Sequence, residues 1–281
     1  MQSQYLKIKS HNGKNIFQIQ HPKFSATISE FGGQLLSFTP LEQDDLLWLS
    51  RSATLDGSKP IRGGVPICWP WFGPAKGVNE GEPQHGYIRQ LPWQINEVVE
   101  SNEQMTIRIS PLLSEQLKQK LGLDVYVIFE FSDQATINII TTNISNSSIE
   151  FSQAIHTYFH VNDISKTVIN ELQDVDFIDQ LEQGEIKNQQ TPVIIDKAVD
   201  RIYLYKQSDI SISTEHRDID IKGIGHDSVV VWSPWITGAK NMSDFDNDGY
   251  KNMLCVEMAL TQGYQLKPDE TYSLSQTFSA S

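Results

Sequence analysis

The sequence is short of cysteine, of basic residues and of long apolar runs, and each shortage excludes a class of protein. Two cysteines among 281 residues form at most one disulfide, so the chain is not a disulfide-stapled scaffold. Cys68 and Cys255 each lie in an apolar stretch, and we expect both to be buried free thiols, because free cysteine packs as a small hydrophobic group. No apolar run approaches the ~18 residues that a membrane-spanning helix needs.

The charge balance is acidic: 22 basic residues against 35 acidic residues give a formal net charge of −13. Nucleic acid is bound by basic surfaces that displace counterions, and anionic membranes attract basic segments, so we expect neither as a partner. An anionic ligand must instead be held by a local group of arginines or lysines, against the field of the whole protein.

Length and composition are typical of a globular protein, with 39% apolar and 20% charged residues. A chain of this length can bury a large core without covalent staples. No internal repeat or low-complexity linker divides the chain, and we expect one domain over residues 1–281. The N-terminal residues lack the basic start and apolar core of a signal peptide, so we expect a cytoplasmic location.

Apolar and polar residues alternate with a period of two along most of the chain, the pattern of half-buried β-strands. In Thr271–Phe278, for example, Tyr272, Leu274 and Phe278 share one face, and Gln276 is the one polar residue on it. Similar segments are bounded by Asn, Asp, Ser and Gly. They are Glu103–Ser110, Leu123–Phe131, Ala135–Ile144, Phe151–His160, Thr167–Leu172, Asp209–Thr214, Ser228–Trp232 and Met253–Met258.

Helical spacing of apolar residues is scarce, and Pro111–Leu121 is the segment in which we expect a short helix. Many short strands with almost no helices between them predict an all-β fold, with antiparallel sheets packed face to face in one large sandwich. The polar stretch Gln180–Gln190 is interpreted as a surface excursion from this sandwich.

Ile61–Pro74 breaks the strand pattern with three glycines and three prolines. Arg62 precedes Gly63 and Gly64, and glycine lets a ligand approach the backbone closely. The alternative is a hydrophobic loop in which Arg62 makes an ordinary salt bridge.

A second irregular segment, Gln84–Arg89, combines His85 with Arg89 on a turn. Histidine titrates near neutral pH, and the arginine fork fits phosphate or carboxylate. The alternative is a turn histidine beside a surface arginine.

The segment His156–Ile164 ends a predicted strand, on which His156, Tyr158 and His160 share a face. Two histidines at this spacing suggest a zinc site, but no third ligand lies at a recognisable spacing, so we expect no metal there.

Glu257 lies within the apolar strand Met253–Ala259. Burying a carboxylate is costly unless it is paired, so Glu257 either has a structural partner or takes part in chemistry, and we favour chemistry.

Asp244–Gly249 matches the opening of an EF-hand calcium loop, but Cys255 stands where that loop needs a bidentate glutamate. Because no predicted helices flank it, we interpret this segment as an acidic surface loop rather than a calcium site.

Taken together, these segments resemble the aldose 1-epimerase superfamily and, within it, the hexose-6-phosphate mutarotases. The resemblance covers essentially the whole chain and is carried by the runs RGGVPICWPWFGP, QHGYIR, HTYFHVNDI, VDRIY and YKNMLCVE. The chain has HGYIR where the family pattern has HGFAR, WSPW where it has WNPW, and Met258 where it has proline. None of these positions is a proton-transfer residue in the family.

The resemblance implies a β-sandwich of the galactose mutarotase type, with His156 and Glu257 as the catalytic pair. Interconversion of α and β anomers opens a hemiacetal and closes it on the other face. A base removes the C1 hydroxyl proton while an acid protonates the ring oxygen. Glu257 as carboxylate suits the base and protonated His156 suits the acid, and the reaction needs no cofactor and no metal.

The resemblance also implies the substrate contacts. His85 matches a second histidine near the sugar, and Asp200 matches an acidic residue that holds sugar hydroxyls. Arg62 and Arg89 match the arginines of the mutarotases that act on phosphosugars. We therefore expect a monomer that acts on a small-molecule hexose 6-phosphate, with glucose 6-phosphate as the expected substrate.

Three other functions stay open on the sequence alone. Asp200 and Glu257 could form the carboxylate pair of a glycoside hydrolase. The chain could be a mutarotase for unphosphorylated aldoses, or a carbohydrate-binding sandwich without catalysis.

Overall fold

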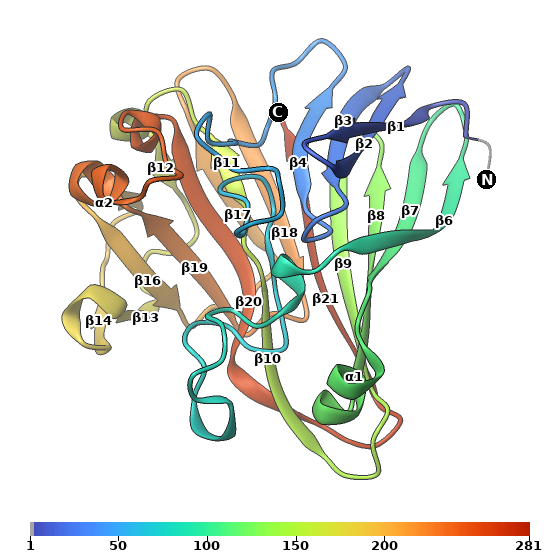
Figure 1. Ribbon diagram of the computed structural model, residues 1–281. Helices are drawn as coiled ribbons and strands as arrows, with labels where there is room; N and C mark the ends of the chain where they lie inside the picture. Colours follow the sequence, from blue (N-terminus) through green and yellow to red (C-terminus); the bar gives the residue numbers. More distant parts are fainter. Residues whose placement is uncertain (1–2) are drawn as a thin grey trace.

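The computed structural model describes residues 3–281, apart from the side chain of Val78, and antiparallel strands make up most of its regular secondary structure (Figure 1). The predicted all-β class is confirmed. The strands form three sheets, of four, eight and nine strands. The four-stranded sheet comprises β1 (Leu6–His11), β2 (Lys14–His21), β3 (Phe24–Ser29) and β4 (Leu35–Pro40).

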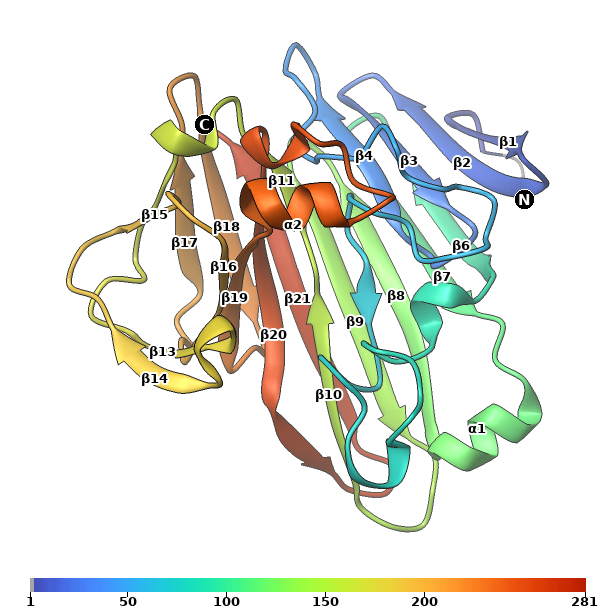
Figure 2. The same ribbon diagram turned by 60° about the vertical axis from the view of Figure 1, so that its left-hand side comes forward.

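The eight-stranded sheet includes strands from three of the segments that the sequence singled out, Ile61–Pro74, His156–Ile164 and Met253–Ala259, and Figure 2 shows β19, β20 and β10 side by side in it. In spatial order it comprises β14 (Glu185–Asn188), β13 (Asp176–Asp179), β16 (Val199–Tyr203), β19 (Ser228–Ser233), β20 (Met253–Leu266), β10 (Ile149–Ile155) and β5 (Ile67–Cys68), with β11 (Tyr158–His160) also paired to β20.

The nine-stranded sheet packs against it and completes the sandwich. Its strands in spatial order are β15 (Val193–Ile194), β12 (Val168–Ile169), β17 (Asp209–Ser213), β18 (Asp218–Ile224), β21 (Thr271–Ala280), β9 (Ala135–Asn143), β8 (Leu123–Phe131), β7 (Met105–Pro111) and β6 (Trp93–Glu100).

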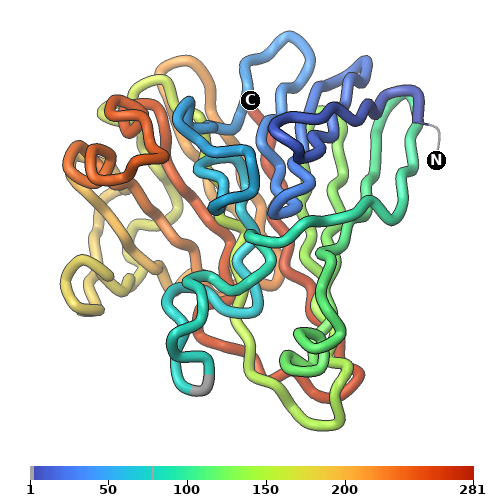
Figure 3. Tube along the Cα trace, in the orientation of Figure 1, coloured from blue at the N-terminus to red at the C-terminus, as the bar shows by residue number. Residues whose placement is uncertain are grey.

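One hydrophobic core joins all three sheets, because alternate residues of their strands point inward. The N-terminal sheet lies beside β8 and β9 (Figure 3), where Phe24 and Phe38 pack against Phe131. Each of these aromatic pairs has ring centroids less than 6 Å apart, within the range of favourable aromatic contacts.

Helices are few and short. Helix α1 (Glu115–Leu121) begins four residues later than the predicted segment, because Ser114 caps it by accepting a hydrogen bond from the Leu117 N–H at 3.2 Å. Helix α2 (Trp235–Asn241) was not predicted; it contains Gly238, a poor helix former. The remaining turns are the 3₁₀ segments η1 (Gly77–Asn79), η2 (Ile88–Gln90), η3 (Ile164–Lys166), η4 (Gln180–Glu182) and η5 (Gly249–Lys251).

None of the helices formed by residues 3–281 has the length and apolar character needed to cross a membrane. The two cysteines are free and buried, as predicted.

Gln276 is the polar exception on the apolar face of β21, and the structure explains it. Its side chain is fully buried and has a partner at each end. The amide nitrogen donates to the Val256 carbonyl at 2.9 Å, and the amide oxygen accepts from the Thr157 hydroxyl. Gln276 therefore ties β21 to the two segments that carry His156 and Glu257.

The turn before η2 depends on Gly86, which has φ of +74° directly after His85, itself at φ of +61°. The Tyr87 N–H donates to the Trp69 carbonyl at 3.0 Å, and a Cβ on Gly86 would collide with that carbonyl oxygen. We expect Gly86→Ala to lower the free energy of unfolding by more than the ~1–2 kcal/mol that left-handed backbone alone costs a non-glycine residue. Chemical denaturation measures the change.

Gly81→Ala is the matched control, because Gly81 has φ of +87° and nothing lies within 4 Å of its Cβ position. Equal destabilisation by the two substitutions would contradict this account of Gly86.

Candidate active site

One face of the eight-stranded sheet carries two of the polar residues that the sequence singled out, Asp200 and Glu257. Asp200 lies opposite Trp232, which lies opposite Cys255, and directly opposed residues share a face. Glu257 follows Cys255 by two residues and points the same way. We call this the site face. The residues between these positions point into the main core.

Glu257 is fully buried on the site face, and His156 is the group it meets. Glu257 Oε1 lies 3.2 Å from His156 Nδ1, but the angles at these atoms do not make a hydrogen bond. Both Glu257 oxygens and the His156 Nδ1 are buried without a hydrogen-bond partner. Buried polar atoms are rarely left unpaired in proteins, so this arrangement points to a polar ligand.

Burial shifts both pKa values toward the neutral forms. Burial and the nearby Asp200 raise the pKa of Glu257 well above its ordinary value. Burial, together with His85, Arg89 and Arg62, lowers the pKa of His156. Both shifts favour a protonated Glu257 carboxyl group and a neutral His156 ring in the unliganded site. The predicted mechanism uses a Glu257 carboxylate and a protonated His156, and desolvation disfavours both of these charged forms in the absence of substrate, so this assignment stays a prediction.

The His156 ring is held by aromatic neighbours. It stacks on Tyr158 with centroids 4.9 Å apart and an interplanar angle of 8°, and the Trp232 ring meets its edge at 6.3 Å. The His156 N–H donates to the Pro66 carbonyl at 3.0 Å, which fixes the backbone. Thr157, the next residue, is held by Gln276. Tyr158 and Gln276 thus help to position the pair, although strand alternation alone did not identify either as a site residue.

His85 lies beside His156, with ring centroids 6.0 Å apart. Its Nδ1 accepts a hydrogen bond from the Gly73 N–H at 3.1 Å, so the proton of the neutral ring is on Nε2. Burial, Arg89 and Arg62 lower the pKa of His85 to about 3. At neutral pH, His85 is therefore an uncharged hydrogen-bond donor, suited to a sugar oxygen.

Arg62 and Arg89 bring positive charge to the same place, since both lower the pKa of His85 and of His156. Arg62 donates to the Tyr158 hydroxyl at 3.1 Å and pairs with Asp244 at 3.5 Å. These two neighbours raise its pKa. The salt bridge considered from the sequence therefore exists.

Arg89 donates to the Gln84 carbonyl at 2.8 Å. Because a guanidinium has five N–H donors, both arginines keep donors for an anion.

The glycines after Arg62 serve packing, a role that the interpretation of the sequence did not include. A Cβ on Gly63 would lie 2.6 Å from the Leu49 Cα, and one on Gly64 would lie 3.0 Å from the Leu36 Cα. Both glycines are needed because protein backbone, not a ligand, approaches them closely.

Asp200 completes the site face. Burial and the neighbouring Asp179 raise its pKa to about 6. Its charge contributes to the raised pKa of Glu257, which is two strands away. Strand β19 lies between the strands that carry Asp200 and Glu257, whereas Glu257 and His156 are in direct contact at 3.2 Å.

His160 does not join this site. Its pKa is lowered by burial and by Arg217, and Arg217 donates to the His160 carbonyl at 3.4 Å. His160 belongs to no group of three candidate metal ligands among residues 3–281. The two histidines at strand spacing thus have separate environments.

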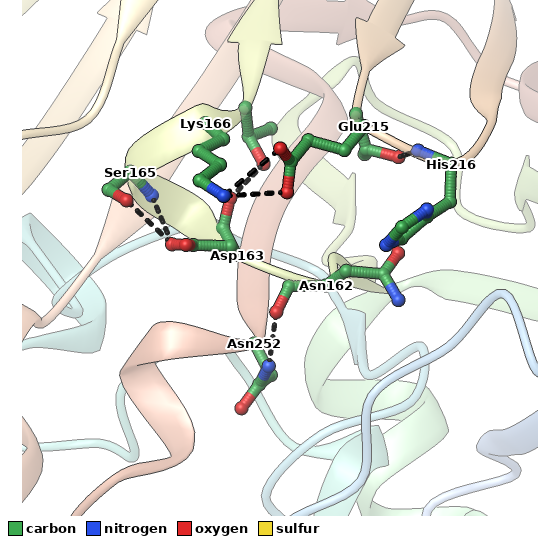
Figure 4. Close-up of polar contacts among 9 residues, drawn as sticks. Asn162, Asp163, Ser165, Lys166, Glu215, His216 and Asn252 are labelled. Atoms are coloured by element: carbon green, nitrogen blue, oxygen red, sulfur yellow. Dashed lines mark hydrogen bonds and ion pairs between the residues drawn. The ribbon is translucent and has the colours of Figure 1, made fainter.

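The end of the same segment is structural. Figure 4 shows that the Asp163 side chain accepts hydrogen bonds from the backbone N–H and the hydroxyl of Ser165, so that Asp163 caps η3. The same figure shows Lys166 paired with Glu215. Asn252 donates to the Asn162 carbonyl at 2.7 Å.

In the acidic loop Asp244–Gly249, each aspartate forms an ion pair with a different basic side chain. Asp244, Asp246 and Asp248 pair with Arg62 (3.5 Å), Arg51 (3.3 Å) and Lys251 (2.9 Å), respectively. Through Asp244 this loop reaches the candidate site, a link that the sequence did not reveal.

Comparison with known proteins agrees with this geometry. Residues 15–279 match the family described as aldose 1-epimerase. A protein of Escherichia coli (strain K12) named "Putative glucose-6-phosphate 1-epimerase" is 34% identical over 250 residues, which are 87% of this chain and 83% of that protein. A plant protein of Cenchrus ciliaris with the same name is 32% identical over 267 residues, 88% of this chain and 78% of its own.

A solved structure from Salmonella typhimurium, titled as a "putative mutarotase", superimposes with a TM-score of 0.91 at 27% identity, covering 100% of this chain and 95% of that one. A galactose mutarotase-like protein from Clostridium acetobutylicum shares the fold, with a TM-score of 0.77 at 13% identity over 99% of this chain and 98% of its own. The fold is therefore the antiparallel sandwich of the galactose mutarotase type.

The raised pKa of Asp200 predicts a pH-dependent penalty on stability. The carboxyl group ionises near 3.8 when unfolded and at about 6 when folded, so the folded state binds the proton more tightly. The penalty is absent below pH 3.8, grows as pH rises toward 6, and is complete above it. We expect Asp200→Asn to raise the free energy of unfolding at pH 8, by at most ~3 kcal/mol, and much less at pH 4.

Denaturant unfolding at the two pH values measures this difference. Asp196→Asn, at an exposed aspartate, is the control and is expected to change neither value. A gain from Asp200→Asn that is the same at both pH values would contradict the assignment.

Proposed function

Since the chain belongs to the aldose 1-epimerase family of carbohydrate epimerases, we propose that it interconverts the α and β anomers of a hexose 6-phosphate, with glucose 6-phosphate as substrate. The observation that carries the choice of a phosphosugar is the pair Arg62 and Arg89. Their charges act on His85 and His156 in a protein whose net charge is −13. The names of the relatives at 31–34% identity support the same substrate.

In ring opening, the base takes the proton of the C1 hydroxyl as the C1=O1 double bond forms. The C1–O5 bond breaks, its electron pair goes to O5, and the acid protonates O5. Rotation about C1–C2 and the reverse steps then give the other anomer. The His156–Glu257 pair holds one proton before and after the cycle, so it needs no external acid or base.

We assign the base to the Glu257 carboxylate and the acid to protonated His156, which requires the shared proton to move from Glu257 to His156 when substrate binds. The charges of Arg89 and Arg62 are among the causes that keep His156 unprotonated. A phosphate dianion at these arginines offsets that repulsion and favours the transfer. The substrate phosphate thus prepares the acid as well as anchoring the sugar.

The other contacts follow from the same placement. The free N–H groups of Arg62 and Arg89 are suited to the phosphate on C6. His85 donates from Nε2, and Asp200 accepts from sugar hydroxyls. These contacts hold C1 against the catalytic pair.

One observation favours a second candidate, a mutarotase for unphosphorylated aldoses. Arg62 already has Asp244 and Tyr158 as partners, and Arg89 has the Gln84 carbonyl. If the two arginines keep these protein contacts and never bind a phosphate group, their role is to stabilise the fold. Comparing glucose with glucose 6-phosphate separates the two candidates.

Glu257→Gln keeps the size of the side chain and removes its proton transfer. We expect kcat for glucose 6-phosphate to fall by ~10²–10⁴-fold with KM nearly unchanged, because a positioned proton-transfer group typically contributes that much. Anomer exchange measured by NMR gives both constants. Glu150→Gln, at an exposed glutamate of β10, is the matched control, and near-wild-type turnover of Glu257→Gln would remove Glu257 from the mechanism.

Arg89→Ala and Arg62→Ala are each expected to raise KM for glucose 6-phosphate by roughly 10–100-fold with a smaller loss of kcat, since a hydrogen bond to a charged group is worth ~1.5–3 kcal/mol. Exchange of glucose should change little in either variant. Arg51→Ala tests for a general charge effect, because Arg51 is largely exposed and pairs with Asp246. An unchanged KM for glucose 6-phosphate in both variants would favour the mutarotase for unphosphorylated aldoses. Wild-type protein that exchanges the anomers of glucose as fast as those of glucose 6-phosphate would favour it too.

A further inference from the structure

Cys255 lies on the site face but has no part in the proposed reaction. Its sulfur, a carboxylate oxygen of Glu257 and a ring nitrogen of His156 all lie within 4.8 Å of one another. Strand β20 places Cys255 and Glu257 two residues apart on the same face, and His156 comes from the segment that follows β10. Three donors of different chemistry therefore meet at the catalytic pair.

The oxygen and nitrogen donors are not used by the protein. Both Glu257 oxygens and the His156 Nδ1 are buried and have no hydrogen-bond partner. Their separation of 3.2 Å is near the distance between two ligands of one tetrahedral zinc ion, roughly 3.4 Å for bonds of ~2.0–2.1 Å. Lone pairs that face one small volume at this spacing suit a shared cation.

We propose that His156, Cys255 and Glu257 form an inhibitory site for zinc or a similarly soft divalent cation, which competes with the sugar. Thiolate, imidazole and carboxylate together select zinc, whereas magnesium and calcium prefer oxygen ligands alone. Three protein ligands leave a fourth position for water, as in open zinc sites. On binding, the Cys255 thiol and the His156–Glu257 pair each release one proton to solvent.

The surrounding charges are compatible with a cation. Arg62 and Arg89 oppose it, but Arg62 is paired with Asp244, and Asp200 lies on the same face. The whole protein, at −13, attracts cations. The three donors lie within 4.8 Å of one another, and zinc holds sulfur and nitrogen roughly 3.6 Å apart, so closing the site requires a shift of about 1 Å at most.

Metal binding is independent of the proposed function, whereas inhibition rests on it. A cation here occupies the Glu257 and His156 atoms that ring opening requires, and the sugar and the cation therefore exclude each other. The experiment measures binding and inhibition separately.

Binding is measured by titrating the wild-type protein with cobalt(II) chloride. We expect the near-ultraviolet charge-transfer absorption of a thiolate–cobalt bond, removed by zinc chloride and reduced by saturating glucose 6-phosphate. The absorption should be absent in Cys255→Ala and retained in Cys68→Ala, the matched control at the other buried thiol. Circular dichroism verifies that both variants fold. Absence of the band in the wild type, or its survival in folded Cys255→Ala, overturns the proposal.

If Cys255→Ala does not fold, Glu257→Gln replaces it: loss of one ligand should weaken cobalt binding by about tenfold or more, since removing even an outer-shell partner costs ~10–100-fold. Unchanged affinity overturns the proposal.

Inhibition is measured by anomer exchange of glucose 6-phosphate with zinc chloride, and with magnesium chloride as control. Zinc should raise the apparent KM in the wild type, and folded Cys255→Ala should need at least about tenfold more zinc for the same effect. Magnesium should have no effect. A thiolate–cobalt band in a protein that exchanges no anomers leaves the metal site standing and overturns the proposed function. If the thiolate–cobalt band appears but zinc does not inhibit anomer exchange of glucose 6-phosphate, the inhibitory role is overturned.

Discussion

Glu257 lies fully buried on the site face of β20, and the organisation of the site follows from the cost of keeping a carboxyl group there. Desolvation favours the protonated acid, and the same burial keeps His156 neutral. The two groups lie 3.2 Å apart, and burial disfavours the charged form of each. In the proposed reaction this pair acts as acid and base in turn, which suits a reaction whose two halves are mirror images.

The sandwich behind the site holds this contact in place. Gln276, on the opposite sheet, bonds the carbonyl of Val256 and the hydroxyl of Thr157, the neighbours of Glu257 and His156. The Val256 N–H also donates to the Thr157 carbonyl at 3.3 Å. A fully satisfied buried polar network resists displacement, because each broken bond would leave an unpaired group in an apolar core. The proposed catalytic pair is therefore anchored to the sheet, and irregular segments carry the proposed substrate contacts.

Those irregular segments converge through backbone contacts. Gly63 and Gly64 let the loop after Arg62 run against two other backbone segments, and Gly86 lets the turn of His85 meet Trp69. Asp244 reaches back to Arg62 from the loop after α2. Asp200, buried with a raised pKa, is a carboxyl group that lowers stability at neutral pH. Retaining such a group is consistent with a use in substrate binding.

The amino-acid sequence by itself determined the fold class, because strand alternation with period two records which side chains each sheet buries. It also marked Glu257 and Gln276, since a polar residue in an apolar strand requires a partner. The family motifs selected His156, His85, Arg62 and Arg89. Only the tertiary structure decided how these groups meet: that Glu257 contacts His156 while His160 does not, and that Asp244 pairs with Arg62.

Local patterns also failed where long-range contacts govern. The glycines after Arg62 face backbone more than ten residues away in the chain, and helix α1 begins at its cap rather than at the first leucine of its pattern. The pKa shifts of Glu257 and His156 were likewise inaccessible, because a pKa depends on burial and on charges brought together by the fold. Periodicity reports the environment along one strand, and the site is assembled from contacts between strands and loops.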